Sequence, residues 1–359
     1  MTASPTHPRQ PEKNRETGVV LLVVLFFALL LTSGVATFLR RSTVDAMISR
    51  NRDAAARAEA LARGGIRLGG ALLLEDRLRE AAGASLPFDT ELDPWAEGLD
   101  LETPNGARLR VRVEDTGSRL NLNALFEVEE SGQVAAKETA EDFLMALLGK
   151  AIDEIPRPPG EKPYEVRELA GNLIDFVDSD EVRVQGGAED AWYQSQTPPT
   201  RAANRPLFSV DELRLVEGFD AELVEALRPY VSVYPYAPGG CEREEVGCGI
   251  NLNTAPPHVL GLLYYDDGVE LRLAPEDVVR QVLELRQKGE TICPPSQQEE
   301  ACTPIGDIVT NAVFPPPTWS ADLFVVTAEA RVGEVRRTIE AVVDRSQGTD
   351  LRLLSWQTR

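Results

Sequence analysis

Histidine is almost absent from this sequence, and with it the usual means of enzymatic proton transfer. The two histidines are His7, close to the amino terminus, and His258, which follows two prolines. No G-x-S-x-G segment and no G-x-x-x-x-G-K-[ST] segment occurs. Triad hydrolases, histidine-rich metal enzymes and P-loop nucleotidases depend on these residues. We therefore expect no enzyme, and a hydrolase using Asp175 and Asp178 as an acid pair is the one enzymatic alternative left open.

Positive charge is also scarce. The chain has 37 Lys and Arg against 58 Asp and Glu, which gives a formal net charge of -21. DELRLVEGFDAELVEAL and INLNTAP are similar to the helix-hairpin-helix elements that hold DNA phosphates. Only Gly218 of the usual glycine pair is present, however, and Asp220 and Glu222 follow it. Carboxylates repel a phosphate backbone, so we expect no nucleic-acid partner.

The sequence has only four cysteines, in two local pairs: Cys241 with Cys248, and Cys293 with Cys302. Zinc sites usually space their ligands more closely, so two short disulfide loops are the better interpretation. Three pairings are possible, and locality favours 241–248 with 293–302. Disulfides would place this region outside the cytoplasm.

One long stretch contains no charge at all. It runs from Val19 to Leu39 and ends at Arg40 and Arg41. About twenty apolar residues in a helix span the hydrocarbon core of a bilayer. A signal peptide would have a shorter apolar core followed by a small-x-small cleavage site, so the sequence predicts a membrane helix that stays attached.

The amino-terminal flank of this helix resembles a class III prepilin leader. A short polar segment with Arg9, Lys13 and Arg15 ends at Gly18, directly before the first apolar residue. In such leaders a prepilin peptidase cuts after the glycine, so the resemblance implies a mature chain that starts at Val19. An ordinary uncleaved anchor is the alternative.

The fifth mature position departs from the general pilin pattern. It is Val23, where pilins carry a Glu that pairs with the terminal ammonium of the subunit above. An unpaired carboxylate costs a few kcal/mol in an apolar slab. Valine is therefore what a subunit with nothing above it is expected to tolerate.

Apolar residues at three- and four-residue intervals continue the membrane helix to about Ala82. Alternating patterns predict strands at 107–113, 323–332, 334–344 and 351–356, with a hairpin at Gly333. Between them we expect helices over 138–148, 164–176, 209–216, 221–231, 255–264, 275–288 and 305–314. The sequence thus predicts an α+β fold in which a long helix packs on a small antiparallel sheet that carries a large, mainly helical insertion.

Several segments, occurring in a fixed order along the chain, together resemble one family. They are VVLLVVLFFALL without Glu, GSRLNLNAL, LIDFVDSD before GAEDAWY, FSVDELRLVEGF and INLNTAP. This set is similar to the K-type minor pseudopilin of the type II secretion system, the general secretion pathway protein K. The resemblance implies a pilin-like fold with a helical insertion and a place at the tip of the pseudopilus. It also implies the I and J minor pseudopilins and the pseudopilus shaft as partners.

On that basis we expect six segments: a leader over 1–18, a membrane helix over 19–40, its extension over 41–83, sheet strands over 84–133, the helical insertion over 134–320, and carboxy-terminal strands over 321–359. The expected location is the inner membrane, with the large domain in the periplasm. The expected role is initiation of the pseudopilus and export of folded periplasmic proteins. A periplasmic calcium-binding receptor or enzyme on an uncleaved anchor is the alternative.

The densest acidic group is the candidate metal site. Asp178, Asp180 and Glu189 occupy positions one, three and twelve of a calcium-loop register, but Val182 and Arg183 do not fit an EF-hand. A turn at Gly186 and Gly187 would bring Glu189 and Asp190 back to the aspartates. The K-type family is similar in binding calcium in its helical domain. The resemblance therefore implies a structural calcium site at Asp175, Asp178, Asp180, Glu189 and Asp190.

Overall fold

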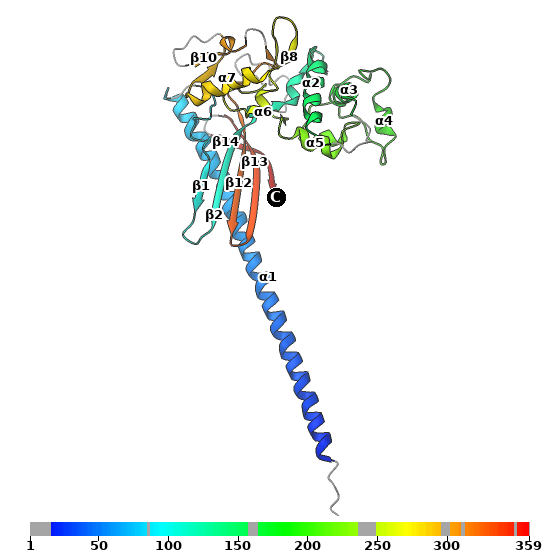
Figure 1. The fold of residues 1–359 in the computed structure, drawn as a ribbon, viewed down its shortest axis with the longest axis vertical. Helices are drawn as coiled ribbons and strands as arrows, with labels where there is room; N and C mark the ends of the chain where they lie inside the picture. The colour runs from blue at the N-terminus through cyan, green and yellow to red at the C-terminus, as the bar shows by residue number, and fades with distance from the viewer. Residues whose placement is uncertain are drawn as a thin grey trace, which may run out of the picture.

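The computed structural model describes residues 16–84, 87–156, 164–235, 249–295, 302–309, 313–347 and 350–358. Its main feature is the helix α1 (Glu16–Ala81), which runs as a straight rod into a globular head. The first half of α1 stands free of the head in Figure 1, and its side chains from Val19 to Arg52 are exposed. The second half packs against the head. The predicted continuation of the membrane helix into the head is confirmed.

The head begins with a five-stranded antiparallel sheet in the order β1-β2-β12-β13-β14. Its strands are β1 (Leu99–Glu102), β2 (Arg108–Asp115), β12 (Leu323–Val332), β13 (Val335–Gln347) and β14 (Asp350–Thr358). The alternating patterns therefore predicted four of the strands, and β1 was missed. Sequence-distant strands pair here: Val326 of β12 lies opposite Val113 of β2.

One core lies between α1 and this sheet. Inward side chains of alternate strand residues, such as Val111, Val326 and Ala341, meet Ala62 and Leu73 of the helix. The approach is close because α1 presents glycine to the sheet. A Cβ on Gly69 would lie 2.5 Å from Val326 Cγ1, and a Cβ on Gly65 would lie 2.8 Å from Ala328 Cβ. We call the helix and sheet together the pilin body.

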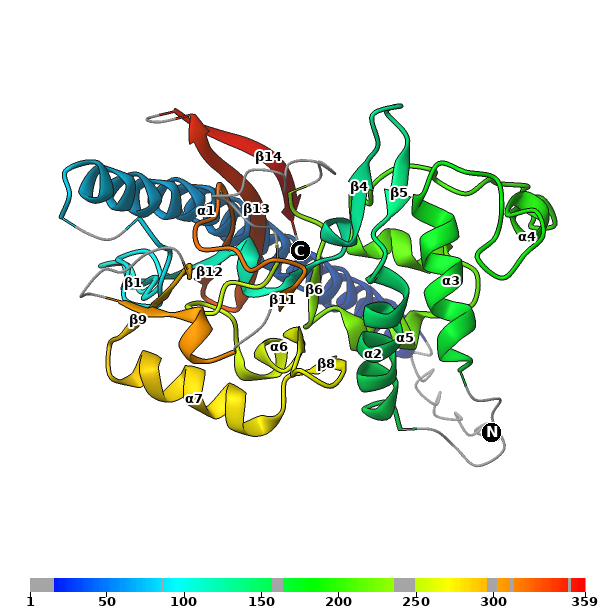
Figure 2. The ribbon, with the colours of Figure 1, turned by 90° about the horizontal axis from the view of Figure 1, so that it is seen from above.

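A second, larger core fills the inserted domain, which comprises the described residues between β2 and β12. Its helices are α2 (Ala140–Asp153), α3 (Val166–Val177), α4 (Asp190–Gln194), α5 (Ala221–Leu227), α6 (Pro257–Leu260) and α7 (Glu276–Gln287). Seen from above, α2 to α5 gather on one side and α6, α7 and β9 on the other (Figure 2). The prediction of a pilin-like body with a large insertion is confirmed.

The insertion is less helical than expected. The 3-10 segments are η1 (Thr116–Ser118), η2 (Leu122–Leu125), η3 (Val210–Leu215) and η4 (Ile305–Asp307). Short strands are β3 (Leu120–Asn121), β4 (Phe126–Val128), β5 (Val134–Ala136), β6 (Val231–Ser232), β7 (Tyr264–Asp266), β8 (Leu271–Leu273), β9 (Thr291–Cys293), β10 (Cys302–Pro304) and β11 (Val313–Phe314).

Three expected helices are wrong for this reason. The segment 209–216 forms the 3-10 turn η3. The segment 255–264 contains only the single helical turn α6, followed by the start of β7. Of the segment 305–314, most of the described residues belong to η4 and β11. Apolar spacing over so few residues does not distinguish a buried helix from buried irregular structure, and here the tertiary core decided.

Candidate functional site

The candidate metal site lies in the loop between α3 and α4. Asp178 follows α3, and the chain turns back through Gly186 and Gly187, which have φ values of 85° and 107°. These are left-handed conformations that glycine adopts without strain. The turn is closed by the Arg183 amide, which donates to the Gly187 carbonyl at 3.1 Å. It brings Glu189 back beside Asp178 as predicted from sequence.

Three carboxylates meet there: oxygen atoms of Asp178, Asp180 and Glu189 lie within 4.8 Å of one another. Asp178 and Glu189 are buried, while Asp180 is exposed. Asp178 Oδ1 and Glu189 Oε1 are buried without a hydrogen-bond partner. Buried carboxylate oxygens normally have a partner, because leaving one unpaired costs about 1–3 kcal/mol. The donor set therefore fits a hard, oxygen-binding cation.

Electrostatics support the same conclusion. Burial, with the nearby charges of Asp180 and Asp175, raises the pKa of Asp178 to about 7. Burial and the charges of Asp178 and the other two aspartates raise the pKa of Glu189 to about 8. Crowded, buried carboxylates repel one another and destabilise the folded state unless a cation or protons neutralise their charge.

The other two predicted ligands are engaged elsewhere. Asp175 Oδ1 accepts from the Val184 amide at 2.8 Å, and Asp175 Oδ2 lies 3.6 Å from Arg183 Nε. Asp190 begins α4, where its Oδ1 accepts from the Ala202 amide at 3.3 Å. The structure thus brings together three of the five predicted residues, and the charge of Asp175 acts on Asp178 and Glu189 without joining the group.

Cys293 and Cys302 form a disulfide with a Cα–Cα distance of 5.9 Å. It joins β9 to β10, which run parallel as neighbours. This is the local pairing that the sequence favoured. Cys241 and Cys248 lie outside the described residues.

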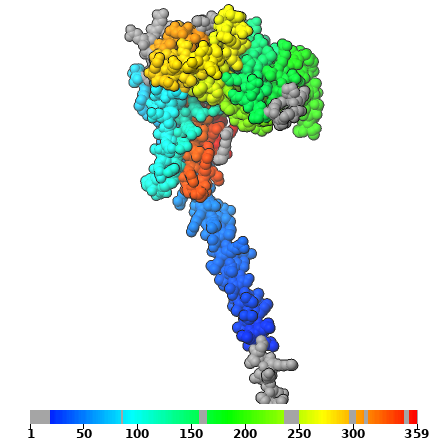
Figure 3. Space-filling model, viewed as in Figure 1, coloured from blue at the N-terminus to red at the C-terminus, as the bar shows by residue number. Residues whose placement is uncertain are grey.

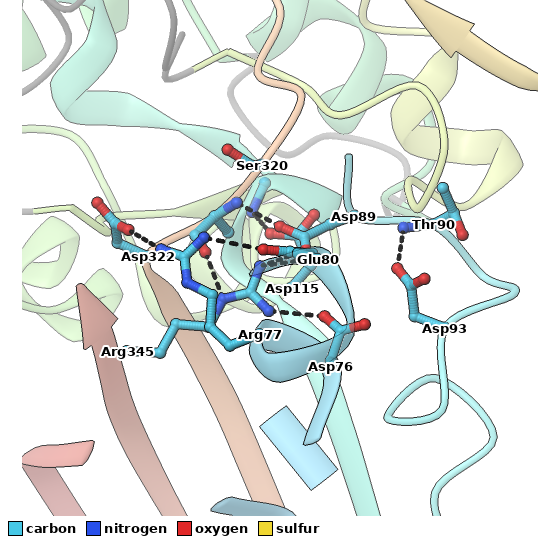
Figure 4. Close-up of polar contacts among 12 residues, drawn as sticks. Asp76, Arg77, Glu80, Asp89, Thr90, Asp93, Asp115, Ser320, Asp322 and Arg345 are labelled. Atoms are coloured by element: carbon cyan, nitrogen blue, oxygen red, sulfur yellow. Dashed lines mark hydrogen bonds and ion pairs between the residues drawn. The ribbon is translucent and has the colours of Figure 1, made fainter. Parts of the chain in front are cut away.

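Sequence reasoning missed a buried charge cluster where the pilin body meets the inserted domain (Figure 4). Arg345 of β13 is fully buried and donates from Nη1 to Asp76 of α1 at 2.8 Å. Its Nη2 donates to Asp89, and its Nε donates to the Ala321 carbonyl at 3.0 Å. Asp89 also accepts from the Ala321 amide. Four chain segments are therefore held together by one guanidinium.

Burial raises the pKa of Asp89 well above its usual range, while Arg345 acts to lower it. For Arg345, burial acts to lower the pKa, but Asp89, Glu80 and Asp76 together keep it above the ordinary value. A signal for these residues was present in the sequence. Arg345 continues the inward alternation of Ile339, Ala341 and Val343, and Asp76 lies three residues after the buried Leu73.

Two repeated motifs hold distant segments of the inserted domain together. In LNLN, Asn123 Nδ2 donates to the carbonyls of Leu207 and Val233, and Asn123 Oδ1 accepts from the Leu207 amide. In INLN, Asn253 makes the equivalent pair of bonds with Ile292, through Nδ2 at 2.9 Å and Oδ1 at 2.8 Å. Each asparagine side chain thus mimics a strand partner inside the core.

The motif at 250–253 also reaches the sheet. Asn251 Nδ2 donates to Asp115 Oδ2 at 2.8 Å and to the Asp89 carbonyl at 3.1 Å. Asp115 is the last residue of β2 and is buried. The insertion is therefore fixed to the body by buried polar bonds at the top of the sheet, next to the Arg345 cluster.

In the part of the chain that the structure describes, α1 is the one helix long and apolar enough to cross a membrane. A membrane-spanning helix that continues into a packed antiparallel sheet defines a pilin-like subunit, and the insertion marks it as an unusual one.

Comparisons with known proteins give the same class. Residues 118–236 match the family described as "Type II secretion system (T2SS), protein K". The type II secretion system protein K of Pseudomonas aeruginosa is 31% identical over 256 residues, which cover 70% of this chain and 69% of that protein. That of Klebsiella pneumoniae is 29% identical and covers 76% of both. A protein of Escherichia coli described as a type II secretion system protein K is 31% identical over 39% of this chain, and this chain spans 40% of its length.

A solved structure has a similar fold. The crystal structure of the GspK-GspI-GspJ complex from the type 2 secretion system of enterotoxigenic Escherichia coli matches with a TM-score of 0.52. The match has 21% sequence identity and covers 89% of this chain and 99% of the matched chain. The chain belongs to the protein K family of the type II secretion system, and its role is that of a minor pseudopilin. The resemblance stated from sequence is confirmed.

Proposed function

We propose that this chain is a non-enzymatic assembly subunit that caps the tip of the pseudopilus. The position of the insertion carries this proposal. The inserted domain covers the end of the pilin body that is farthest from the membrane end of α1 and overhangs the sheet (Figure 1). In a filament that grows by adding subunits from the membrane below, the first subunit alone has nothing above it. A wide domain at that end would obstruct any subunit stacked over it.

The amino terminus supports the same position. Val23 removes the carboxylate that would pair with a subunit above, and burying that group unpaired would be costly. We propose that α1 lies in the inner membrane before assembly and in the filament core afterwards, with the head in the periplasm. The Cys293–Cys302 disulfide supports an oxidising compartment for the head.

The partners follow from this position. A structure of similar fold comes from a complex of three secretion components, named GspK, GspI and GspJ in its description. We propose that this chain likewise associates with minor pseudopilins of the I and J types. Together they would start the pseudopilus that exports folded periplasmic proteins through the outer membrane.

Cleavage of the leader tests the function. Gly18→Leu places a bulky side chain at the cleavage junction, so the prepilin peptidase is expected to leave the precursor uncut and export to fall to the level of a deletion strain. The measurements are the mass of the amino-terminal peptide and the amount of exported protein in the medium. Gly306→Leu is the control, because Gly306 is exposed in the head and no other atom lies within 4 Å of its Cβ position. Normal export by the uncut Gly18→Leu precursor would contradict the proposal.

We also propose a structural calcium ion held by Asp178, Asp180 and Glu189. The ion would neutralise the crowded carboxylates and occupy the two oxygens that lack partners. It would fix the loop between α3 and α4 against the inserted core. No step of assembly is assigned to the ion itself.

Metal removal tests this site. Chelation is expected to lower the melting temperature of the disulfide-intact protein by several degrees, since a ligand bound only to the folded state stabilises it by mass action, about 2.7 kcal/mol at a hundredfold excess over Kd. Glu189→Gln should remove most of that response, while Glu334→Gln, an exposed carboxylate, should keep it. An unchanged melting temperature in wild-type protein after chelation would rule the site out.

A further inference from the structure

The strand β14 forms a free edge of the pilin sheet. In the described part of the chain the nine-residue strand β14 pairs with β13 alone, through seven residue pairs with two register shifts. Its outer backbone N–H and C=O groups therefore lack a strand partner. Such an edge is a template for pairing with another chain unless the sequence protects it.

The opposite edge of the same sheet is protected. There β1 has only four residues, and two of them carry charge. Asp100 accepts from Arg110 Nη2 at 3.0 Å, and Glu102 lies 3.7 Å from Arg108 Nη2. Short length and outward charge are the usual means of preventing edge pairing.

Neither charge nor proline protects residues 353–358 of β14, although the ladder to β13 has a register shift at Leu354, between the pairs Val343–Leu353 and Val342–Ser355. Residues 353–358 read LLSWQT, with no charge and no proline. Leu353, Leu354 and Trp356 are 52%, 44% and 38% exposed. In a chain with 26% charged residues, an exposed, uncharged run of this length at a sheet edge indicates a surface that is covered in the assembled state.

The exposed side chains continue an existing core. Trp356 lies opposite Ala341, and Leu353 lies opposite Val343. Ala341 and Val343 belong to the core between the sheet and α1. Because residues directly opposite in a ladder share a face, Trp356 and Leu353 extend this apolar face beyond β13. A further strand beside β14 would bury both.

Close to β14, a groove separates the inserted domain from the sheet face that points away from α1. This groove of about 520 Å³ is lined by Thr327, Glu340 and Gln357 of that sheet face. Its other wall includes Asp211, Glu225 and Arg228 of the inserted domain. Figure 3 shows the domain projecting over the strands, with an open notch below it. An incoming chain would meet the edge of β14 and the underside of the domain together.

We propose that an extended strand of a neighbouring, different minor pseudopilin pairs with the free edge of β14 in this notch. The proposal rests on the proposed function. Backbone hydrogen bonds would supply affinity, and apolar side chains toward α1 would supply specificity. A second copy of this chain fits less well, since each copy carries a formal charge of -21 and two would repel.

Copurification from membranes tests the docking surface. Leu353→Lys and Trp356→Lys introduce a charge where the incoming strand would bury apolar area. Each variant is expected to reduce recovery of the other minor pseudopilins with the full-length chain by about tenfold, at an unchanged melting temperature. The matched control is Val269→Lys, because Val269 is 90% exposed on the turn between β7 and β8. Recovery should be unchanged in this control.

A second measurement covers the case in which either lysine variant unfolds. Leu354→Cys in assembled membranes is expected to cross-link to a neighbouring pseudopilin, while Val269→Cys does not. Full copurification by folded lysine variants, or no cross-link at Leu354→Cys, overturns the docking surface. A cross-link between two copies of this chain overturns the stated occupant. Processing of the leader and the effect of Gly18→Leu do not depend on β14, so a failure here remains distinct from failure of the proposed function.

Discussion

Arg345 is the largest fully buried side chain among the described residues. Its guanidinium contacts Asp76, Asp89 and the Ala321 carbonyl, and its carbon lies 4.4 Å from the centre of the Phe324 ring. A buried ion pair is weak evidence for net stability, since desolvation offsets the attraction. Its effect here is geometric: the donors fix the end of α1, the segment that follows α1 and the segment that leaves the insertion relative to β13.

Removing the Arg345 guanidinium while its carboxylate partners remain should therefore lower the free energy of unfolding strongly. We expect Arg345→Met to destabilise the fold by about 3–5 kcal/mol, because Asp76 and Asp89 would remain buried without their partner. Urea unfolding followed by circular dichroism measures the effect. Arg331→Met is the control, because Arg331 is exposed and its partner Glu334 lies 3.8 Å away, so stability should not change measurably. Equal effects of the two substitutions would show that the buried cluster has no special role.

At the scale of elements, the spacing between α1 and the sheet depends on glycine. Gly65 and Gly69 face β2 and β12, whose inward side chains occupy the space that a Cβ would need. Glycine in a helix interior costs stability in the isolated helix. The close approach of helix and sheet compensates by bringing Val111 and Val326 against the helix backbone.

Two alanine substitutions separate these effects. Gly69→Ala is expected to destabilise the pilin body by about 1–3 kcal/mol, because the new methyl would meet Val326 Cγ1 at 2.5 Å. Gly64→Ala should stabilise it by about 0.5–1 kcal/mol, since nothing lies within 4 Å of that position and only helix propensity changes. Thermal melting of both variants measures the difference. Shifts of the same sign would contradict the close-packing argument.

At the scale of the whole molecule, membrane anchor and inserted domain lie at opposite ends of α1 (Figure 1). This arrangement predicts where the chain occurs in the filament. An epitope label on the head should appear at one end of each isolated pseudopilus by electron microscopy, because the overhang obstructs a subunit above. A label on the major subunit should appear along the length. Labelling of the head along the shaft would overturn the tip position.

Much of the architecture could be predicted from sequence. The long helix, four strands and the large insertion follow from periodicity, which local chemistry imposes over many residues. The strand β1 is too short to show a recognisable alternation of apolar and polar residues. The segments 209–216 and 305–314 are too short for apolar spacing to distinguish a helix from a turn.

The candidate metal site could likewise be predicted from sequence only in part. The acidic residues and the glycine turn were evident in the sequence, and their return to one loop followed from Gly186 and Gly187. That Asp175 and Asp190 accept hydrogen bonds elsewhere depended on Val184 and Ala202, whose positions no local pattern encodes.

The sequence by itself determined the long apolar helix, the acidic composition and the alternation of the sheet, because each depends on neighbours within a few turns or strand residues, and cleavage after Gly18 stays a prediction from sequence. Only the tertiary structure decided that Arg345 meets Asp76 across 269 positions, that the insertion overhangs the sheet, and that no described strand pairs with the outer edge of β14. These features arise from long-range packing, where the burial of one segment depends on the placement of all the others.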